Sequence, residues 1–271
     1  MPSSTVSCMS GDTTVTCSAD CGPVDLPLSR LRTLAFDALQ GTSHAVMLYG
    51  SHARRRARTD SDIDVLQIVP HRPRSYSQGP VNVTAYTSEH LTELASRGSL
   101  FVRHLSTEGR ILQDTDSVME RILDAYRPPR DYTALRKEVA VALHALREND
   151  FPEGNVVGAV RLARYLTRTA LYITGAEDGV RSFDVDDLTH HVGAPQMSLL
   201  LRCAGPQDPG PLVTQGLSLL GNPPKDPDMP RSLVAITIWS LDRYPTAASL
   251  LECLLAGEAA VDYSALTLPF G

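Results

Sequence analysis

Lysine is nearly missing from this chain of 271 residues, in which all but two of the 25 Lys and Arg residues are arginine. The formal net charge is −6, which argues against nucleic-acid binding by the whole surface and leaves room only for a local basic groove. No apolar run approaches the ~20 residues that a membrane helix needs. The N-terminus lacks the basic start and apolar core of a secretory signal, so we expect a cytoplasmic protein without a membrane partner.

The cysteines are few and show no spacing typical of a zinc site. None of the five forms a C-x-x-C pair, and they lie at positions 8, 17, 21, 203 and 253. We therefore expect free thiols. Hydrophobic residues make up 42% of the chain and charged residues 21%, which predicts a soluble globular protein.

One stretch, residues 46–65, organises the rest of the chain and reads VMLYGSHARRRARTDSDIDV. An apolar run, residues 45–49, ends at Gly50 and Ser51, and an Arg-rich segment follows. A second apolar run, residues 65–69, comes directly after Asp64. This pattern predicts a strand, a glycine turn, a short helix and a second strand.

The residues around this turn have the chemistry of a metal–nucleotide site. Asp62 and Asp64 are two positions apart, so an extended strand presents both carboxylates on one face. Such a pair repels itself unless a cation lies between the two groups, and hard oxygen ligands suit Mg²⁺. Gly50 allows a backbone to approach a phosphate, and Ser51 with the first helical amides can donate hydrogen bonds to it.

Gly50-Ser51, ten intervening residues and Asp62-Ile63-Asp64 together resemble the signature of the DNA polymerase beta-like nucleotidyltransferase superfamily, closest to its minimal and aminoglycoside-type bacterial members. The resemblance implies transfer of a nucleoside monophosphate from an NTP, with release of pyrophosphate. It also implies two Mg²⁺ ions, or Mn²⁺ in their place, on Asp62 and Asp64. The implied nucleotide contacts are Gly50, Ser51, Arg54 and Ser61. From the residues alone, the alternative is an acidic turn before an ordinary strand.

A third strand is predicted at residues 81–87, where β-branched residues alternate with polar ones. Members of the superfamily usually carry a third carboxylate here, which completes the metal site and acts as general base. The matching residue in this chain is Asn82, which has no charge and cannot accept the proton. Glu89 is an alternative, although an acid at that place also suits the start of a helix. The general base is therefore left open.

The predicted fold class is α+β, with a small mixed β-sheet nucleotidyltransferase lobe and its flanking helices followed by an all-helical domain. We expect a flexible tail at residues 1–24, a catalytic domain at 25–127 and a helical substrate-binding domain at 128–271. Pro128-Pro129 marks the second boundary. Apolar periodicity predicts helices at 27–39, 88–96 with Ser88 as cap, 132–147, 155–173 with Asn155 as cap, 197–203, 212–220, 232–244 and 247–256.

Two polar patterns in the helical part have more than one interpretation. Arg161, Arg164 and Arg168 form a stripe on one helix face, which either binds triphosphate or an anionic acceptor or faces solvent. The segment FDVDDLTHHV favours a helix capped by Asp184 or Asp186, and its acids are also candidates to meet a cationic substrate.

Three functions are compatible with these residues. The favoured one is a nucleotidyltransferase that transfers from an NTP, with ATP as the expected donor, to a hydroxyl or phosphate of a small molecule. The second is an enzyme of a toxin–antitoxin or defence system that modifies a protein or an RNA end, although the acidic balance leans against nucleic acid. The third is a non-catalytic nucleotide-binding protein, which Asn82 suggests. The resemblance also makes a homodimer an expected partner.

Overall fold

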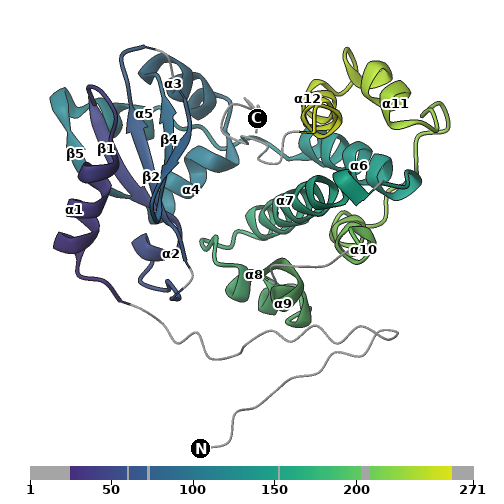
Figure 1. Ribbon diagram of the computed structural model, residues 1–271, viewed down its shortest axis with the longest axis horizontal. Coiled ribbons are helices and arrows are strands. Elements are labelled where there is room, and N and C mark those ends of the chain that lie inside the picture. Colours follow the sequence, from purple (N-terminus) through teal and green to yellow (C-terminus); the bar gives the residue numbers. More distant parts are fainter. Residues whose placement is uncertain (1–24, 60, 72–73, 152, 203–207, 258–271) are drawn as a thin grey trace, which may run out of the picture.

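The protein is an α+β structure in a computed structural model that describes residues 25–59, 61–71, 74–151, 153–202 and 208–257 (Figure 1). A five-stranded mixed sheet with flanking helices is followed by a helical region. The predicted fold class is confirmed. The predicted tail at 1–24 lies outside the described residues. Across the part of the chain that is described, no helix is long and apolar enough to cross a membrane.

The sheet has the strand order β3-β4-β2-β1-β5. Its strands are β1 (Ala45–Tyr49), β2 (Ile63–Ile68), β3 (Tyr76–Gln78), β4 (Val81–Tyr86) and β5 (Arg110–Asp114). β2 and β4 are parallel, and the other neighbours are antiparallel. The strands predicted on both sides of the glycine turn and at 81–87 are confirmed. The apolar pattern predicts no strand between residues 69 and 81, so β3 was missed because its short polar sequence has no apolar alternation.

Helices cover both faces of the sheet. These helices are α1 (Leu28–Ala38), α3 (Ser88–Ser96), α4 (Leu100–Glu108) and α5 (Val118–Asp124), and the short elements α2 (Gly50–Ala53) and η1 (Thr115–Ser117) lie in connections. Val46 and Leu48 of β1 pack in the cluster that contains α1, whereas Met47 packs with α3, α4 and α5 on the opposite face. This alternation follows from the two-residue period of a strand.

The N-terminal cap of α3 differs from the prediction. Thr87, not Ser88, is the capping residue, and its hydroxyl oxygen accepts a hydrogen bond from the His90 amide at 3.3 Å. Thr87 has extended backbone angles that suit a cap, whereas Ser88 is already the first helical residue. Adjacent hydroxyl residues are hard to distinguish from sequence, because both have the required chemistry.

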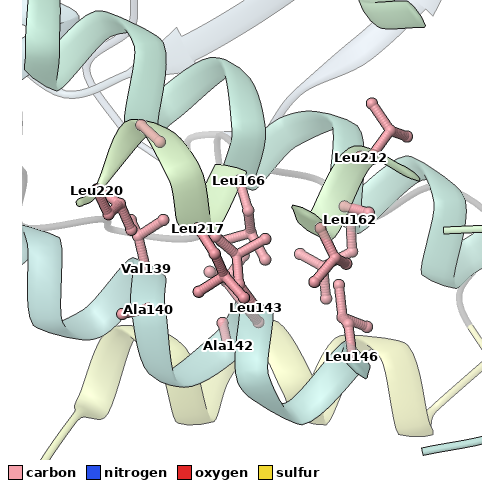
Figure 2. Packing of buried hydrophobic residues seen from close by; sticks show 14 of the residues in the cluster. Val139, Ala140, Ala142, Leu143, Leu146, Leu162, Leu166, Leu212, Leu217 and Leu220 are labelled. Carbon is pink, nitrogen blue, oxygen red and sulfur yellow. The ribbon is translucent and has the colours of Figure 1, made fainter. Parts of the chain in front are cut away.

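The helical region comprises α6 (Thr133–Glu148), α7 (Glu153–Glu177), α8 (Val185–His191), α9 (Gln196–Arg202), α10 (Gly210–Leu219), α11 (Leu233–Ser240) and α12 (Pro245–Leu255). Leucines from α6, α7 and α10 interlock in its core (Figure 2). A Cβ on Gly216 of α10 would lie 2.9 Å from Leu143 Cδ1 and 3.0 Å from Thr167 Oγ1. The glycine therefore permits the close approach of α10 to both long helices.

Helix α7 is longer than its apolar pattern predicts. It begins at Glu153, so Asn155 lies inside the helix and is not its cap, and it continues past Ile173 to Glu177. Gly175 near its end faces α8, where a Cβ would lie 2.4 Å from Leu188 Cδ2. Tight packing against α8 explains why a glycine is accepted in the last turns of this helix.

Candidate functional site

The end of β1 brings Gly50 directly against Asp64. Tyr49 pairs with Asp64 in the antiparallel register of β1 and β2, and Gly50 is the next residue. Its φ is +72°, and a Cβ at this position would lie only 2.3 Å from Asp64 Oδ2. A side chain here would meet both a strained backbone and the carboxylate, so glycine is required. The two halves of the sequence motif are therefore in contact.

A buried histidine joins α2 to the residue that precedes Asp62. His52 is 6% exposed, and its Nε2 lies 3.3 Å from the carbonyl oxygen of Ser61. Ser61 was a predicted nucleotide contact. Its hydroxyl accepts a hydrogen bond from the Arg58 amide at 2.9 Å, so it also stabilises the turn before Asp62. His52 was not predicted as a site residue, and its position directly after Gly50-Ser51 is its only local signal in the sequence.

The predicted metal ligands lie at the start of β2, next to the third position on β4. Asp62 is exposed, Asp64 is half-buried, and Asp64 pairs with Asn82 in the parallel register. The Asn82 side-chain oxygen accepts a hydrogen bond from the Ser77 hydroxyl at 2.7 Å. Glu89 is exposed in the first turn of α3, where an acid is favourable for the helix dipole. The structure thus places Asn82, rather than Glu89, beside Asp64 on the sheet.

The surroundings of Asp64 disfavour the charged form of its carboxyl group. Burial first, and then the charge of Asp62, raise the pKa of Asp64 to about 7, while Arg54 and Arg168 act in the opposite direction. A cation between the two carboxylates would relieve this repulsion, and two carboxylates with further oxygens from phosphates suit Mg²⁺. The described residues contain no group of three or more His, Cys, Asp or Glu side chains placed to hold a metal. Asp62 and Asp64 therefore fit the ion only as a partial ligand set, which a phosphate ligand would complete.

Arg54, a predicted nucleotide contact, is engaged by a carboxylate of α4. Its Nη1 donates to Glu108 Oε2 at 2.7 Å, and His104 Nε2 lies 3.1 Å from the same oxygen. The other oxygen, Glu108 Oε1, accepts from the Phe183 amide at 2.8 Å. Burial alone would raise the pKa of Glu108, but the hydrogen bonds from His104 and Phe183 and the charge of Arg54 lower it. Glu108 is therefore an ionised centre that joins α2, α4 and the segment before α8.

The acids of α8 pair with arginines rather than remaining available. Asp184 caps the helix by accepting from the Asp186 and Asp187 amides, which confirms the predicted structural role. The three carboxylates also form ion pairs with arginines of the loop after α2 and of α9. These pairs are Arg54–Asp184, Arg56–Asp184, Arg56–Asp187, Arg58–Asp186, Arg202–Asp184 and Arg202–Asp186. Figure 1 shows α8 beside α2.

The arginine stripe of α7 divides between solvent and the site. Arg161 is exposed, whereas Arg164 and Arg168 are half-buried. Arg168 Nη2 donates to the Leu201 carbonyl at 2.9 Å, next to Arg202, which pairs with the same Asp184 carboxylate as Arg54 of the glycine-turn segment. The charge of Arg168 also lowers the pKa of Asp64. Arg168 is therefore a predicted contact whose charge acts on the carboxylate pair, whereas Arg161 is exposed.

Comparisons with known proteins found no matching family model and no curated protein that matches the chain. A functional assignment therefore depends on the residues around Gly50 and Asp64.

Proposed function

We propose that this protein is a Mg²⁺-dependent nucleotidyltransferase that transfers a nucleoside monophosphate from an NTP, with ATP as the expected donor, to a small-molecule acceptor. The observation that carries the proposal is the contact between Gly50, which lacks a Cβ and has a φ of +72°, and the carboxylate of Asp64. This contact joins a turn with the chemistry of a phosphate site to a carboxylate pair for which the described residues supply no ion pair.

Each part of the turn has a distinct role in this proposal. The first amides of α2 and the Ser51 hydroxyl donate hydrogen bonds to the phosphates. His52 fixes the distance between this turn and the strand by its contact with the Ser61 carbonyl. Asp62 and Asp64 would hold Mg²⁺, which would supply positive charge to stabilise the reacting phosphate oxygens.

The reaction is an in-line displacement at the α-phosphorus. An oxygen of the acceptor hydroxyl or phosphate forms the new P–O bond while the bond to the β-phosphate oxygen breaks and pyrophosphate leaves. The acceptor proton is released to water or to a basic group. Asn82 beside Asp64 lends at most a neutral oxygen, because an amide cannot take up that proton.

The test is acceptor-dependent release of pyrophosphate from each common NTP in the presence of Mg²⁺. Acceptors are supplied as pools of small metabolites and aminoglycosides, and Asp62→Asn/Asp64→Asn serves as the inactive variant. Asp242→Asn is the matched control, since it removes an exposed carboxylate from the turn after α11. We expect release that requires an acceptor, is retained in the control and is lost in the double variant. Release that persists in the double variant would show that the reaction does not need the carboxylate pair.

A second candidate is a nucleotide-binding protein without catalysis. It is favoured by Asn82, whose side-chain oxygen is already engaged by Ser77 at 2.7 Å. In this case the protein binds Mg²⁺ and nucleotide but releases no pyrophosphate with any acceptor. Restoring a carboxylate by Asn82→Asp would then introduce activity, whereas an enzyme that works with Asn82 would already be active without it.

A further inference from the structure

The half-buried face of α7 that packs near α9 carries a positive charge at Arg168. Arg168 is half-buried, and its hydrogen bond to the Leu201 carbonyl uses only one of its N–H donors. Its Nε is buried and has no hydrogen-bond partner. Among the described residues Arg168 forms no ion pair with a carboxylate, and an Arg guanidinium carries five donors in a planar fork. The side chain therefore retains donors for an anion.

The carboxylates near this face are already neutralised. Glu108 pairs with Arg54, and Asp184, Asp186 and Asp187 each pair with at least one of Arg54, Arg56, Arg58 and Arg202. A cationic acceptor, which the acidic sequence of α8 had suggested as one interpretation, would have to break these pairs. Breaking a partly buried pair leaves an uncompensated charge and is costly.

The nucleotide has other partners in the proposed site. Gly50 at the start of α2 lies against Asp64, whereas Arg168 belongs to α7 and donates to the Leu201 carbonyl, next to Arg202, which shares the Asp184 carboxylate with Arg54. The phosphates and the acceptor thus meet the carboxylate pair from different elements of the fold. Resting on the proposed function, we infer that Arg168 binds an anionic group of the acceptor, so that the acceptor is a phosphorylated or carboxylated small molecule rather than an aminoglycoside.

The first experiment compares matched acceptor pools that are phosphorylated, carboxylated or cationic, using pyrophosphate release with Mg²⁺ and ATP. We expect the anionic pools to respond and the cationic pool to remain silent. In Arg168→Gln the KM for the responding acceptor should rise at least tenfold, whereas the Kd of a non-hydrolysable ATP analogue changes less than twofold. Arg168→Lys, which keeps the charge and loses the fork, should recover part of the affinity.

Arg161→Gln is the matched control, because it removes an exposed arginine two turns earlier on the same helix. Its KM should stay within twofold of the parent protein, and thermal melting of both variants checks that each is folded. A response confined to the cationic pool would overturn the inference and leave the proposed function intact. Loss of nucleotide affinity in Arg168→Gln with an unchanged acceptor KM would also overturn it, because Arg168 would then serve the triphosphate.

A second measurement decides the inference if no pool releases pyrophosphate. Inorganic phosphate is titrated into the protein loaded with Mg²⁺ and the ATP analogue, and into the protein alone if the analogue does not bind. Saturable binding that is lost in Arg168→Gln and retained in Arg161→Gln supports an anion site at Arg168. Absence of binding, or binding that is equal in both variants, contradicts it. Failure of nucleotide binding itself would instead reject the proposed function.

Discussion

His52 Nε2 lies 3.3 Å from the carbonyl oxygen of Ser61, the residue directly before Asp62. A buried imidazole therefore sets the spacing between the glycine turn and the carboxylate pair. Because His52 positions the carboxylate pair without being a proposed ligand contact itself, its loss should affect ligand binding more than folding.

We expect His52→Ala to weaken binding of a Mg²⁺–ATP analogue about tenfold, the equivalent of roughly one hydrogen bond of ~1.4 kcal/mol. His52→Gln, which retains an N–H donor, should recover part of this loss. His144→Ala is the control, since His144 is also buried and its Nε2 lies 3.0 Å from the Pro223 carbonyl, far along the chain in the helical region. Calorimetric titration should show unchanged nucleotide affinity for this control, and equal losses in both alanine variants would contradict a positioning role for His52.

Gly50→Ala tests whether the contact with Asp64 matters for function. The new Cβ would lie 2.3 Å from Asp64 Oδ2, so the carboxylate must rotate away. Gly41→Ala provides a matched backbone penalty, because Gly41 has the same φ of +72° with nothing within 4 Å of its added Cβ. Both variants should lose ~1 kcal/mol or somewhat more in urea unfolding.

The two glycine variants should differ in ligand binding. Only Gly50→Ala should lose Mg²⁺-dependent nucleotide affinity, by at least tenfold, since only there is the carboxylate displaced. Equal nucleotide affinity in Gly50→Ala and the parent protein would mean that the contact has no functional consequence.

The raised pKa of Asp64 predicts a pH-dependent effect on stability. The pKa is about 7 in the folded protein and 3.8 ordinarily, so between these values the folded state binds more protons than the unfolded state. The free energy of unfolding contributed by this group therefore falls as pH rises through that window. Asp64→Asn should be more stable than the parent protein at pH 8, by ~1–2 kcal/mol after allowance for solvent screening, and this advantage should shrink toward pH 5.

Urea unfolding at several pH values, without divalent ions, measures this effect. Asp242→Asn, which removes an exposed carboxylate, should show little difference at either pH. An advantage of Asp64→Asn that does not change with pH would refute the electrostatic explanation. Adding Mg²⁺ with nucleotide should reverse the order, because only the parent protein binds the ligand.

Glu108 should be among the most important polar residues for stability. It accepts hydrogen bonds from Arg54 and from the Phe183 amide, and its side chain is only 9% exposed. Glu108→Gln leaves Arg54 without its closest counterion and should cost ~2–4 kcal/mol of unfolding free energy. Glu93→Gln removes the exposed pair with Arg97, 2.6 Å apart, and should cost less than ~1 kcal/mol. Similar losses in the two variants would rule out a special role for Glu108.

Local sequence patterns predicted the strands around Gly50, the long helices α6 and α7 and the Asp184 cap, because each depends on residues close together in the chain. No helix was predicted at α4 or α5. β3 was not predicted, because its three polar residues at the sheet edge show no apolar alternation. The Asn155 cap was wrong because α7 begins before it. The closeness of Gly50 and Asp64 was only implied by their spacing, and the register of β1 and β2 now accounts for it.

The ion pairs that join the segment after α2 to α4 and α8 could not be predicted from the sequence. Arg54 and Glu108 are 54 positions apart, and Arg56 and Asp187 are 131 positions apart. Nothing in either local pattern indicates which acid meets which arginine. Arg54 was an implied nucleotide contact and the acids of α8 were candidates to meet a cationic substrate, yet the arginines after α2 and these acids pair with each other.

The most direct test of the central claim is a calorimetric titration of a non-hydrolysable ATP analogue into the parent protein and Asp62→Asn/Asp64→Asn, each with and without Mg²⁺. A metal–nucleotide site at Gly50 and Asp64 predicts binding to the parent protein that requires Mg²⁺ and is at least tenfold weaker in the double variant. Equal binding in both proteins, or no binding in either, would contradict the claim.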